Sequence, residues 1–413
     1  MSENEDMTEE DHVDIPSTPF LGLAPFLRAS IEGQDLQAFA RAALGNLNQF
    51  PQDANLWINL STLMFTLGQR ESAFATLNQG LSLQRSFEIP ALAQPSSFSV
   101  LMLMVPGDIA ANTPLDCLLE GSDIDLICHY CALDALLPDP LPAHDAVFVA
   151  IGDAPQHRPI LTALATALET LPVRVLNPPQ AIPNTQRDTA CQILQDIPGV
   201  LIPTTYRTSR AQLTAIAETS HALSAIVADL DFPLIVRPFD SHAGRDLERV
   251  ADSAALQRYL DQVPSTEFFI APFIDYSGSD GLFRKFRIAL VDGKPFAVHM
   301  AVSAHWMIHY VNAGMYEDAE KRQEEARFMI NFDAFIARHG QALDMIAERM
   351  GLDYVLFDGA ETQAGELLIF EIDHVMVVHA MDPVELFPYK REPIQQIQTA
   401  FRQLLATSTA ETG

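Results

Sequence analysis

The feature that most constrains the fold is a series of short apolar segments, each of strand length. In the first half of the chain they alternate with turn residues and with a helical segment at residues 158–171. Strands that alternate with helices are typical of a small, mostly parallel sheet. The strands are expected at residues 98–105, 124–128, 145–152 and 173–177. The sequence therefore predicts an α/β domain over residues 96–200.

After residue 200 the pattern changes to paired strands joined by tight turns. VDGKP at residues 291–295 and GAETQAGE at residues 359–366 each separate two strand-like segments, which predicts two β-hairpins. A helix is expected at residues 332–351, ended by Gly351. This part is therefore expected to be α+β, with largely antiparallel sheets.

The N-terminal part has two different patterns. Residues 1–20 are acidic and lack the apolar core of a signal peptide, which predicts a disordered tail. Residues 21–92 are expected to be helical. Within them, residues 54–83 follow the order of one tetratricopeptide repeat, on the positions Trp57, Leu60, Ser61, Gly68, Ala73 and Leu77. This segment is interpreted either as a partner-binding or homodimerising module, or as a helical cap that packs on the rest of the chain.

Charge and cysteine content exclude several classes of protein. Lys and Arg total 25 against 54 Asp and Glu, a formal charge of −29. Such a polyanion repels nucleic acid and anionic membranes, so neither is an expected partner. No apolar run approaches the roughly 20 residues of a membrane-spanning helix. Four cysteines indicate a reduced, cytoplasmic compartment, and Cys128 and Cys131 are expected to be ordinary thiols rather than half of a zinc site.

Two carboxylates stand inside the most apolar strand-like segment, LLIFEIDHVMVVH at residues 367–379. Glu371 and Asp373 are two residues apart, so on a strand they point to the same face. Asp358, on the preceding strand of the hairpin, is expected opposite them. Like charges in apolar surroundings need compensation, and several oxygen ligands suit Mg²⁺ or Mn²⁺. The pattern favours a metal site; the alternative is the solvated polar face of a hairpin.

Basic residues also stand inside strand-like segments of this acidic chain. Arg237 ends the segment PLIVR, and Lys285 and Arg287 alternate with apolar residues in FRKFRIAL. The segment DSHAGRD at residues 240–246 follows Arg237, and its small residues allow backbone N–H groups to approach phosphates. Cations that face carboxylates beside such a loop predict a nucleotide–metal site.

With these motifs in place, residues 98–405 resemble an ATP-grasp carboxylate–amine ligase, near the glutathione synthetase and ribosomal-protein glutamate ligase branch. The resemblance rests on FPLIVRPFDSHAGRDLERV, on FFIAPFIDY, on KFR and on the pair FDG and FEID. It implies an ATP-grasp fold with an N-terminal subdomain at residues 201–268 and a C-terminal subdomain at residues 269–413. The α/β domain and the all-α repeat segment would precede it.

The resemblance also implies roles for individual residues. Arg237 and Arg287 would act in catalysis. The implied nucleotide-binding residues are Arg237, Ser241, His242, Gly244, Ala271, Phe273, Asp275, Lys285 and Asn312. The implied metal ligands are Asp358, Glu371 and Asp373.

The implied reaction uses ATP and Mg²⁺ or Mn²⁺ to convert a carboxylate into an acyl phosphate, which an amine or thiol then attacks. The substrates would be small molecules or peptides. The sequence departs from the family at Arg237 and Thr189, where lysines are usual, and at Asp373, where Asn is usual; His242 interrupts the small-residue loop. These departures leave open a non-catalytic, nucleotide-binding scaffold.

Residues 299–329 have no counterpart in the resemblance. His305 and His309 are spaced to share a helix face, which would suit a metal pair. The favoured interpretation is instead that this segment forms a wall of the acceptor pocket.

Overall fold

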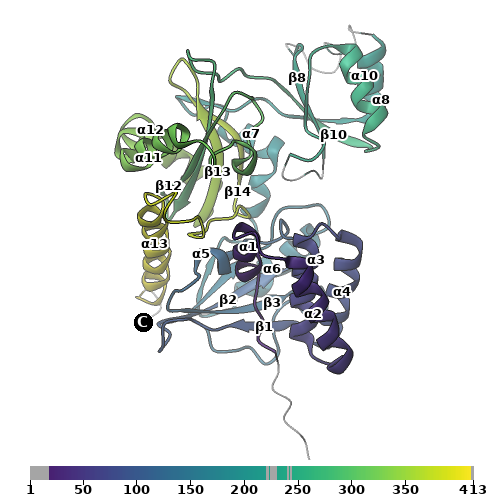
Figure 1. The fold of residues 1–413 in the computed structure, drawn as a ribbon, viewed down its shortest axis with the longest axis vertical. Coiled ribbons are helices and arrows are strands. Elements are labelled where there is room, and N and C mark those ends of the chain that lie inside the picture. Colours follow the sequence, from purple (N-terminus) through teal and green to yellow (C-terminus); the bar gives the residue numbers. More distant parts are fainter. Residues whose placement is uncertain (1–17, 220–222, 224–229, 240, 242–243, 411–413) are drawn as a thin grey trace, which may run out of the picture.

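The computed structural model describes residues 18–219, 223, 230–239, 241 and 244–410. The described chain is a mixed α/β structure with three sheets (Figure 1). Most of the predicted acidic tail lies outside the described residues.

The first sheet contains all four strands predicted in the first half of the chain. Its order is β1-β3-β2-β4-β5, and β2, β3, β4 and β5 pair in parallel. The bounds are Phe98–Met104 for β2, Ile124–Tyr130 for β3, Ala146–Val149 for β4 and Arg174–Leu176 for β5. Helix α6 (Arg158–Leu168) confirms the predicted helix, and the short α5 (Leu115–Leu118), η1 (Ile182–Thr185) and α7 (Arg187–Leu194) complete this part.

The edge strand β1 corrects the sequence analysis. Residues 86–89 were expected in the helical segment, but they form β1 (Ser86–Ile89) and pair antiparallel with β3. Phe87 in the middle of β1 is buried, since it faces the core between the sheet and the helices. The sequence of β1 is too short to show the strand pattern by itself.

Between residue 18 and this sheet the structure describes four helices: α1 (Ala24–Ile31), α2 (Leu36–Gln49), α3 (Ala54–Thr66) and α4 (Arg70–Leu83). Gly68, at a φ of +74°, allows the turn between α3 and α4. Ile58 and Leu77 share one core with Val100 and Met102 of β2. Helices α3 and α4 therefore pack on the sheet, as the helical-cap interpretation expects. Their roles in partner binding and in homodimer formation stay predictions.

The second sheet is antiparallel, with the order β7-β10-β8-β9. Its strands are β7 (Tyr206–Ser209), β8 (Leu234–Pro238), β9 (Glu248–Val250) and β10 (Glu267–Pro272). Helices α8 (Arg210–Glu218) and α10 (Ser253–Gln262) lie beside it at the upper right of Figure 1. Apolar residues of these helices and strands form a separate core.

The third sheet has the order β12-β11-β13-β14-β6. It contains the two predicted hairpins, β11 (Phe283–Val291) with β12 (Lys294–Ser303) and β13 (Tyr354–Glu361) with β14 (Leu367–Asp373). The short strand β6 (Val200–Leu201) adds in parallel to β14. The remaining elements are η2 (Tyr310–Asn312), α11 (Ala319–Ile330), α12 (Phe332–Met350) and α13 (Arg391–Ala410).

A buried asparagine joins the first sheet to the third. The Asn177 side chain donates to the Tyr354 carbonyl at 2.8 Å and accepts from the Tyr354 N–H at 2.9 Å. Asp353 accepts from the Asn177 N–H at 2.8 Å and from Arg174 at 2.7 Å. These bonds fix the third sheet relative to the α/β domain.

Candidate functional site

A cavity of about 440 Å³ lies between the second and third sheets. Strands β8 and β10 supply residues from one side, and β11, β12, β13 and β14 supply residues from the other. Residues 306–311, which follow β12, complete the wall. One part of the lining is apolar, with Ile202, Ile235 and Ile270, and another carries charged side chains. A ligand with an apolar part and an ionic part would match both.

Asp358 lies among the charged residues and is almost fully buried, with 3% of its side chain exposed. It stands opposite Arg287 in the β11–β13 register. Arg287 donates to its two oxygens at 2.7 and 3.1 Å, and the Lys285 Nζ lies 2.7 Å from Oδ2. Burial raises the pKa of the Asp358 carboxyl, but these two cations outweigh it and hold the pKa well below its ordinary value. The cations therefore keep Asp358 ionised.

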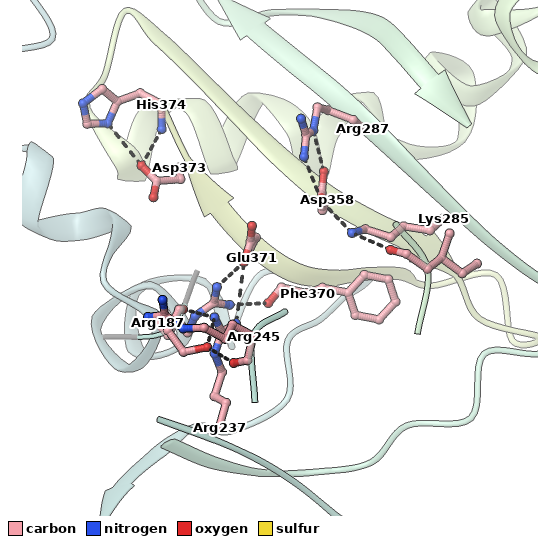
Figure 2. A network of polar contacts seen from close by, with 12 residues as sticks. Arg187, Arg237, Arg245, Lys285, Arg287, Asp358, Phe370, Glu371, Asp373 and His374 are labelled. Carbon is pink, nitrogen blue, oxygen red and sulfur yellow. Dashed lines mark hydrogen bonds and ion pairs between the residues drawn. The ribbon is translucent and has the colours of Figure 1, made fainter. Parts of the chain in front are cut away.

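Glu371 stands opposite Asp358 in the β13–β14 register, as the hairpin predicted. Its Oε2 forms an ion pair with Arg187 and lies 3.9 Å from the Nη1 of Arg237 (Figure 2). Burial raises the pKa of Glu371, but the positive charges of Arg187, Arg237 and Lys285 outweigh it and lower the pKa to about 2. The carboxylate is ionised at neutral pH and lies between two guanidinium groups.

Arg187 was not identified from the sequence. It is the first residue of α7, and its guanidinium lines the cavity. The family resemblance drew attention to position 189, where a lysine is usual, and assigned no role to the arginine two residues earlier. A basic residue at the start of a helix, in so acidic a chain, was the available signal.

Arg237 is buried, with 7% of its side chain exposed, and it lines the cavity. It donates from Nη2 to the carbonyl of Ser241, and Ser241 donates its hydroxyl to the carbonyl of Arg245. Its Nε is buried and has no hydrogen-bond partner among the described residues. Burial, with the nearby charge of Arg187, lowers the pKa of Arg237 to about 9. A buried cation with an unused donor favours the binding of an anion.

Asp373 does not join the other two carboxylates. Its Oδ1 accepts from the His374 N–H at 2.7 Å and lies 3.4 Å from the His374 Nδ1. Figure 2 shows this pair apart from Asp358 and Glu371. Asp373 is the last residue of β14 and still pairs with Leu356, so the backbone follows the expected alternation. Its carboxylate instead bonds to His374, the residue that follows the strand.

The carboxylates at this site do not by themselves provide the ligands that a metal ion needs. Both oxygens of Asp358 already accept from cations, and Asp373 points away. In the part of the chain that the structure describes, no three His, Cys, Asp or Glu side chains gather as a metal site. The assignment of the three carboxylates as metal ligands stays a prediction.

The remaining nucleotide-binding predictions divide between the cavity and the surface. Gly244, Ala271, Phe273 and Lys285 line the cavity. The Phe273 N–H, however, donates to the Pro233 carbonyl at 3.0 Å, so it is already used within the protein.

Asp275 and Asn312 are exposed and are not among the lining residues. The Asp275 side chain accepts from the Ser277 N–H at 3.0 Å, and the Asn312 side chain accepts from the His309 N–H at 3.0 Å. Ser241 is buried beneath Arg237. His242 lies outside the described residues.

Residues 306–311 form part of the cavity wall. That this wall belongs to an acceptor pocket stays a prediction. The alternative in which His305 and His309 share a helix face is excluded, because the chain leaves β12 at Ser303 and is not helical until the short η2. His299 and His309 line the cavity, and burial is the main cause that lowers the pKa of both. Their rings are therefore neutral at pH 7.

A buried polar cluster holds this wall from behind. The Lys390 Nζ donates to the Tyr310 hydroxyl at 2.6 Å and to Asp382 at 2.8 Å. Glu325, which is fully buried, accepts from the hydroxyls of Tyr310 at 2.8 Å and Tyr389 at 2.7 Å. Because Tyr310 lines the cavity, this cluster fixes the shape of the wall.

The described residues include no helix that is both long enough and apolar enough to cross a membrane. No family model matches the chain. Among solved structures, the chain is similar to D-alanyl-alanine synthetase A from Vibrio cholerae, with 11% identity and a TM-score of 0.47; the match covers 76% of this chain and 99% of the other.

The D-alanine-D-alanine ligase from Coxiella burnetii is 13% identical, with a TM-score of 0.46 and 76% and 96% covered. The ATP-grasp ligase PsnB, complexed with precursor peptide PsnA2 and AMPPNP, is 13% identical, with a TM-score of 0.39 and 72% and 99% covered. Because these TM-scores lie below 0.5, we base the functional proposal on the residues of the cavity.

Proposed function

We propose that this protein is an ATP-dependent, ADP-forming ligase of the ATP-grasp family, which joins a carboxylate to an amine or thiol through an acyl phosphate. The substrates are small molecules or peptides. All four cysteines are buried and free, which supports a reducing, cytoplasmic location.

The balance of charge in the cavity carries the proposal. Its described lining includes Arg187, Arg237, Lys285 and Arg287 against Asp358 and Glu371, so four positive charges face two negative ones, a net charge of 4 − 2 = +2. A nucleoside triphosphate with one Mg²⁺ carries a net charge of about −2. The unused Nε of Arg237 is a ready donor for a phosphate oxygen.

The residues have separate tasks in the proposed reaction. The apolar part of the cavity takes the base, and the four cations orient the phosphates. Arg287 and Arg237 stabilise the charge that develops on the transferred phosphoryl group as the substrate carboxylate attacks it. Mg²⁺ enters with ATP as part of the substrate. The neutral wall around Tyr310 excludes water from the acyl phosphate.

The test is release of ADP in a coupled assay with Mg²⁺-ATP and pooled amino acids or short peptides. We expect wild type to release ADP only with a matching pair of substrates. Arg237→Gln is expected to release ADP at least about 100-fold more slowly, which is the typical cost of removing one hydrogen-bond donor to a developing negative charge. Arg338→Gln is the matched control, because Arg338 pairs with Glu361 at the surface and does not line the cavity. Nucleotide binding without ADP release from any pool would favour the non-catalytic scaffold.

A further inference from the structure

Arg187 lines the cavity and forms an ion pair there with Glu371, which is also a lining residue. Its guanidinium pairs with Oε2 of Glu371 and donates to the Phe370 carbonyl at 3.4 Å. The side chain is partly exposed at 24% and lines the cavity, so a ligand can reach it. Arg237 approaches the same oxygen from the second sheet. Glu371 therefore has its compensating positive charge from the protein itself.

A guanidinium and a divalent cation compete for the same carboxylate oxygen. Both neutralise the carboxylate, and both can contact a phosphate oxygen with their remaining donors or coordination positions. Arg187 and Glu371 make one contact, through Oε2, so most of the guanidinium donors remain for a ligand. The other two carboxylates offer little to a metal ion, because Asp358 is paired with Lys285 and Arg287 and Asp373 points to His374.

We propose that Arg187 is a phosphate-binding residue that supplies, from the protein, the positive charge at Glu371 that a protein-bound metal ion would otherwise supply. The nucleotide then binds without a divalent cation, and the Mg²⁺ that accompanies it serves the chemical step. This inference rests on the proposed function.

The charges in the cavity support this assignment. With Arg187 the described lining carries +2, as counted above, and an anion binds to a site that is already positive. Replacing Arg187 by glutamine lowers the net charge to +1 and leaves Glu371 with Arg237 at 3.9 Å as its closest remaining ion-pair partner among the described residues. The carboxylate then repels phosphate unless a metal ion binds between them. The variant should therefore depend on Mg²⁺ where wild type does not.

The experiment is calorimetric titration of the full chain with AMPPNP, a non-hydrolysable ATP analogue, once with excess EDTA and once with Mg²⁺. We expect wild-type affinity to fall by less than about 10-fold when Mg²⁺ is removed. Arg187→Gln is expected to bind at least about 100-fold more weakly than wild type in EDTA and to recover at least about 10-fold with Mg²⁺. Arg187→Lys, which keeps the charge, should bind AMPPNP in EDTA with an affinity between those of wild type and Arg187→Gln. Arg338→Gln should match wild type in both buffers.

A second measurement counts the metal ions directly. Electron paramagnetic resonance with Mn²⁺ and AMPPNP is expected to show one bound Mn²⁺ per wild-type chain. Two bound ions, or wild-type binding that is tight with Mg²⁺ and absent in EDTA, would overturn the role of Arg187 while leaving the proposed function intact. Absence of AMPPNP binding in both buffers, with an unchanged unfolding temperature, would overturn the proposed function and this inference together.

Discussion

The substitution Lys390→Met tests the buried cluster that holds the cavity wall. In wild type the ammonium group, 8% exposed, lies 2.8 Å from Asp382 and 3.5 Å from Glu325. Methionine keeps the length of the side chain and its packing against Phe387, but it removes the charge. Two buried carboxylates then lose their cation, which typically costs about 3–5 kcal/mol.

The lower end of that range applies here. Glu325 keeps three other donors, the Met300 N–H and the hydroxyls of Tyr310 and Tyr389. Asp382 keeps the hydroxyl of Tyr316. Hydrogen bonds to these donors offset part of the lost attraction. We therefore expect the free energy of unfolding to fall by about 3 kcal/mol at pH 7.5.

The loss of stability caused by Lys390→Met should also depend on pH. In wild type, burial raises the pKa of Asp382 but Lys390 outweighs it, so the folded pKa lies below the unfolded value of about 3.9. Such a group contributes stability above its unfolded pKa and loses it as the pH falls through the folded pKa. Without Lys390, burial dominates and the carboxyl gains a proton easily. The difference between wild type and variant should therefore shrink from pH 7.5 toward pH 4.

Urea unfolding monitored by tryptophan fluorescence measures both effects, because Trp306 lies in the wall itself. Lys294→Met is the control, since Lys294 is exposed at the start of β12, and it should change stability by less than about 0.5 kcal/mol. Lys390→Met combined with Asp382→Asn should recover part of the lost free energy of unfolding, because the second substitution removes one of the two carboxylate charges that lost their cation. A loss below about 1 kcal/mol at pH 7.5, or an equal loss at pH 4, would refute this reasoning.

Three further predictions concern the cavity and the core. Arg287→Ala should bind AMPPNP within about tenfold of wild type in calorimetry yet release ADP at least about 100-fold more slowly, because its contact strengthens as charge develops; an equal rate would remove it from the mechanism. Glu371→Gln should abolish Mg²⁺-dependent ADP release with an unchanged circular dichroism spectrum, since it keeps the volume but removes the charge that holds Arg187 and Arg237 in place; full activity would remove Glu371 from the mechanism. Ile58→Ala, at a fully buried contact of α3 with the first sheet, should lower the free energy of unfolding by about 2–5 kcal/mol in urea titration, and a loss under about 1 kcal/mol would indicate a loosely attached helical segment.

Local signals allowed much of the fold to be predicted. Asp292 and Gly293 both have positive φ, 51° and 73°, as a two-residue hairpin turn requires, and this is why VDGKP was a reliable marker. Gly351 ends α12 in the left-handed conformation at a φ of 65°, which the sequence also indicated. Each of these features depends on a few neighbouring residues.

Features that depend on distant residues were harder to predict. The ion pair of Arg187 with Glu371 joins positions 184 residues apart, and no local pattern marks it. The pairing of Asp358 with Glu371 was predictable because one short hairpin carries both. The hydrogen bond of the Asp373 carboxylate was not, because it depends on how the chain turns at His374, after the last residue of β14.

The link between Asn177 and Tyr354 has a consequence for synthesis on the ribosome. The first sheet has all its strands once Leu176 has emerged, but Asn177 finds its two partners only when Tyr354 has been made, 354 − 177 = 177 residues later. At a synthesis rate of roughly 5–20 residues per second, the Asn177 side chain lacks these hydrogen bonds for roughly 9–35 seconds. During that interval the nascent α/β domain exposes a surface that the mature protein buries. Chaperones that bind nascent chains should therefore recognise this domain until the last hairpin docks.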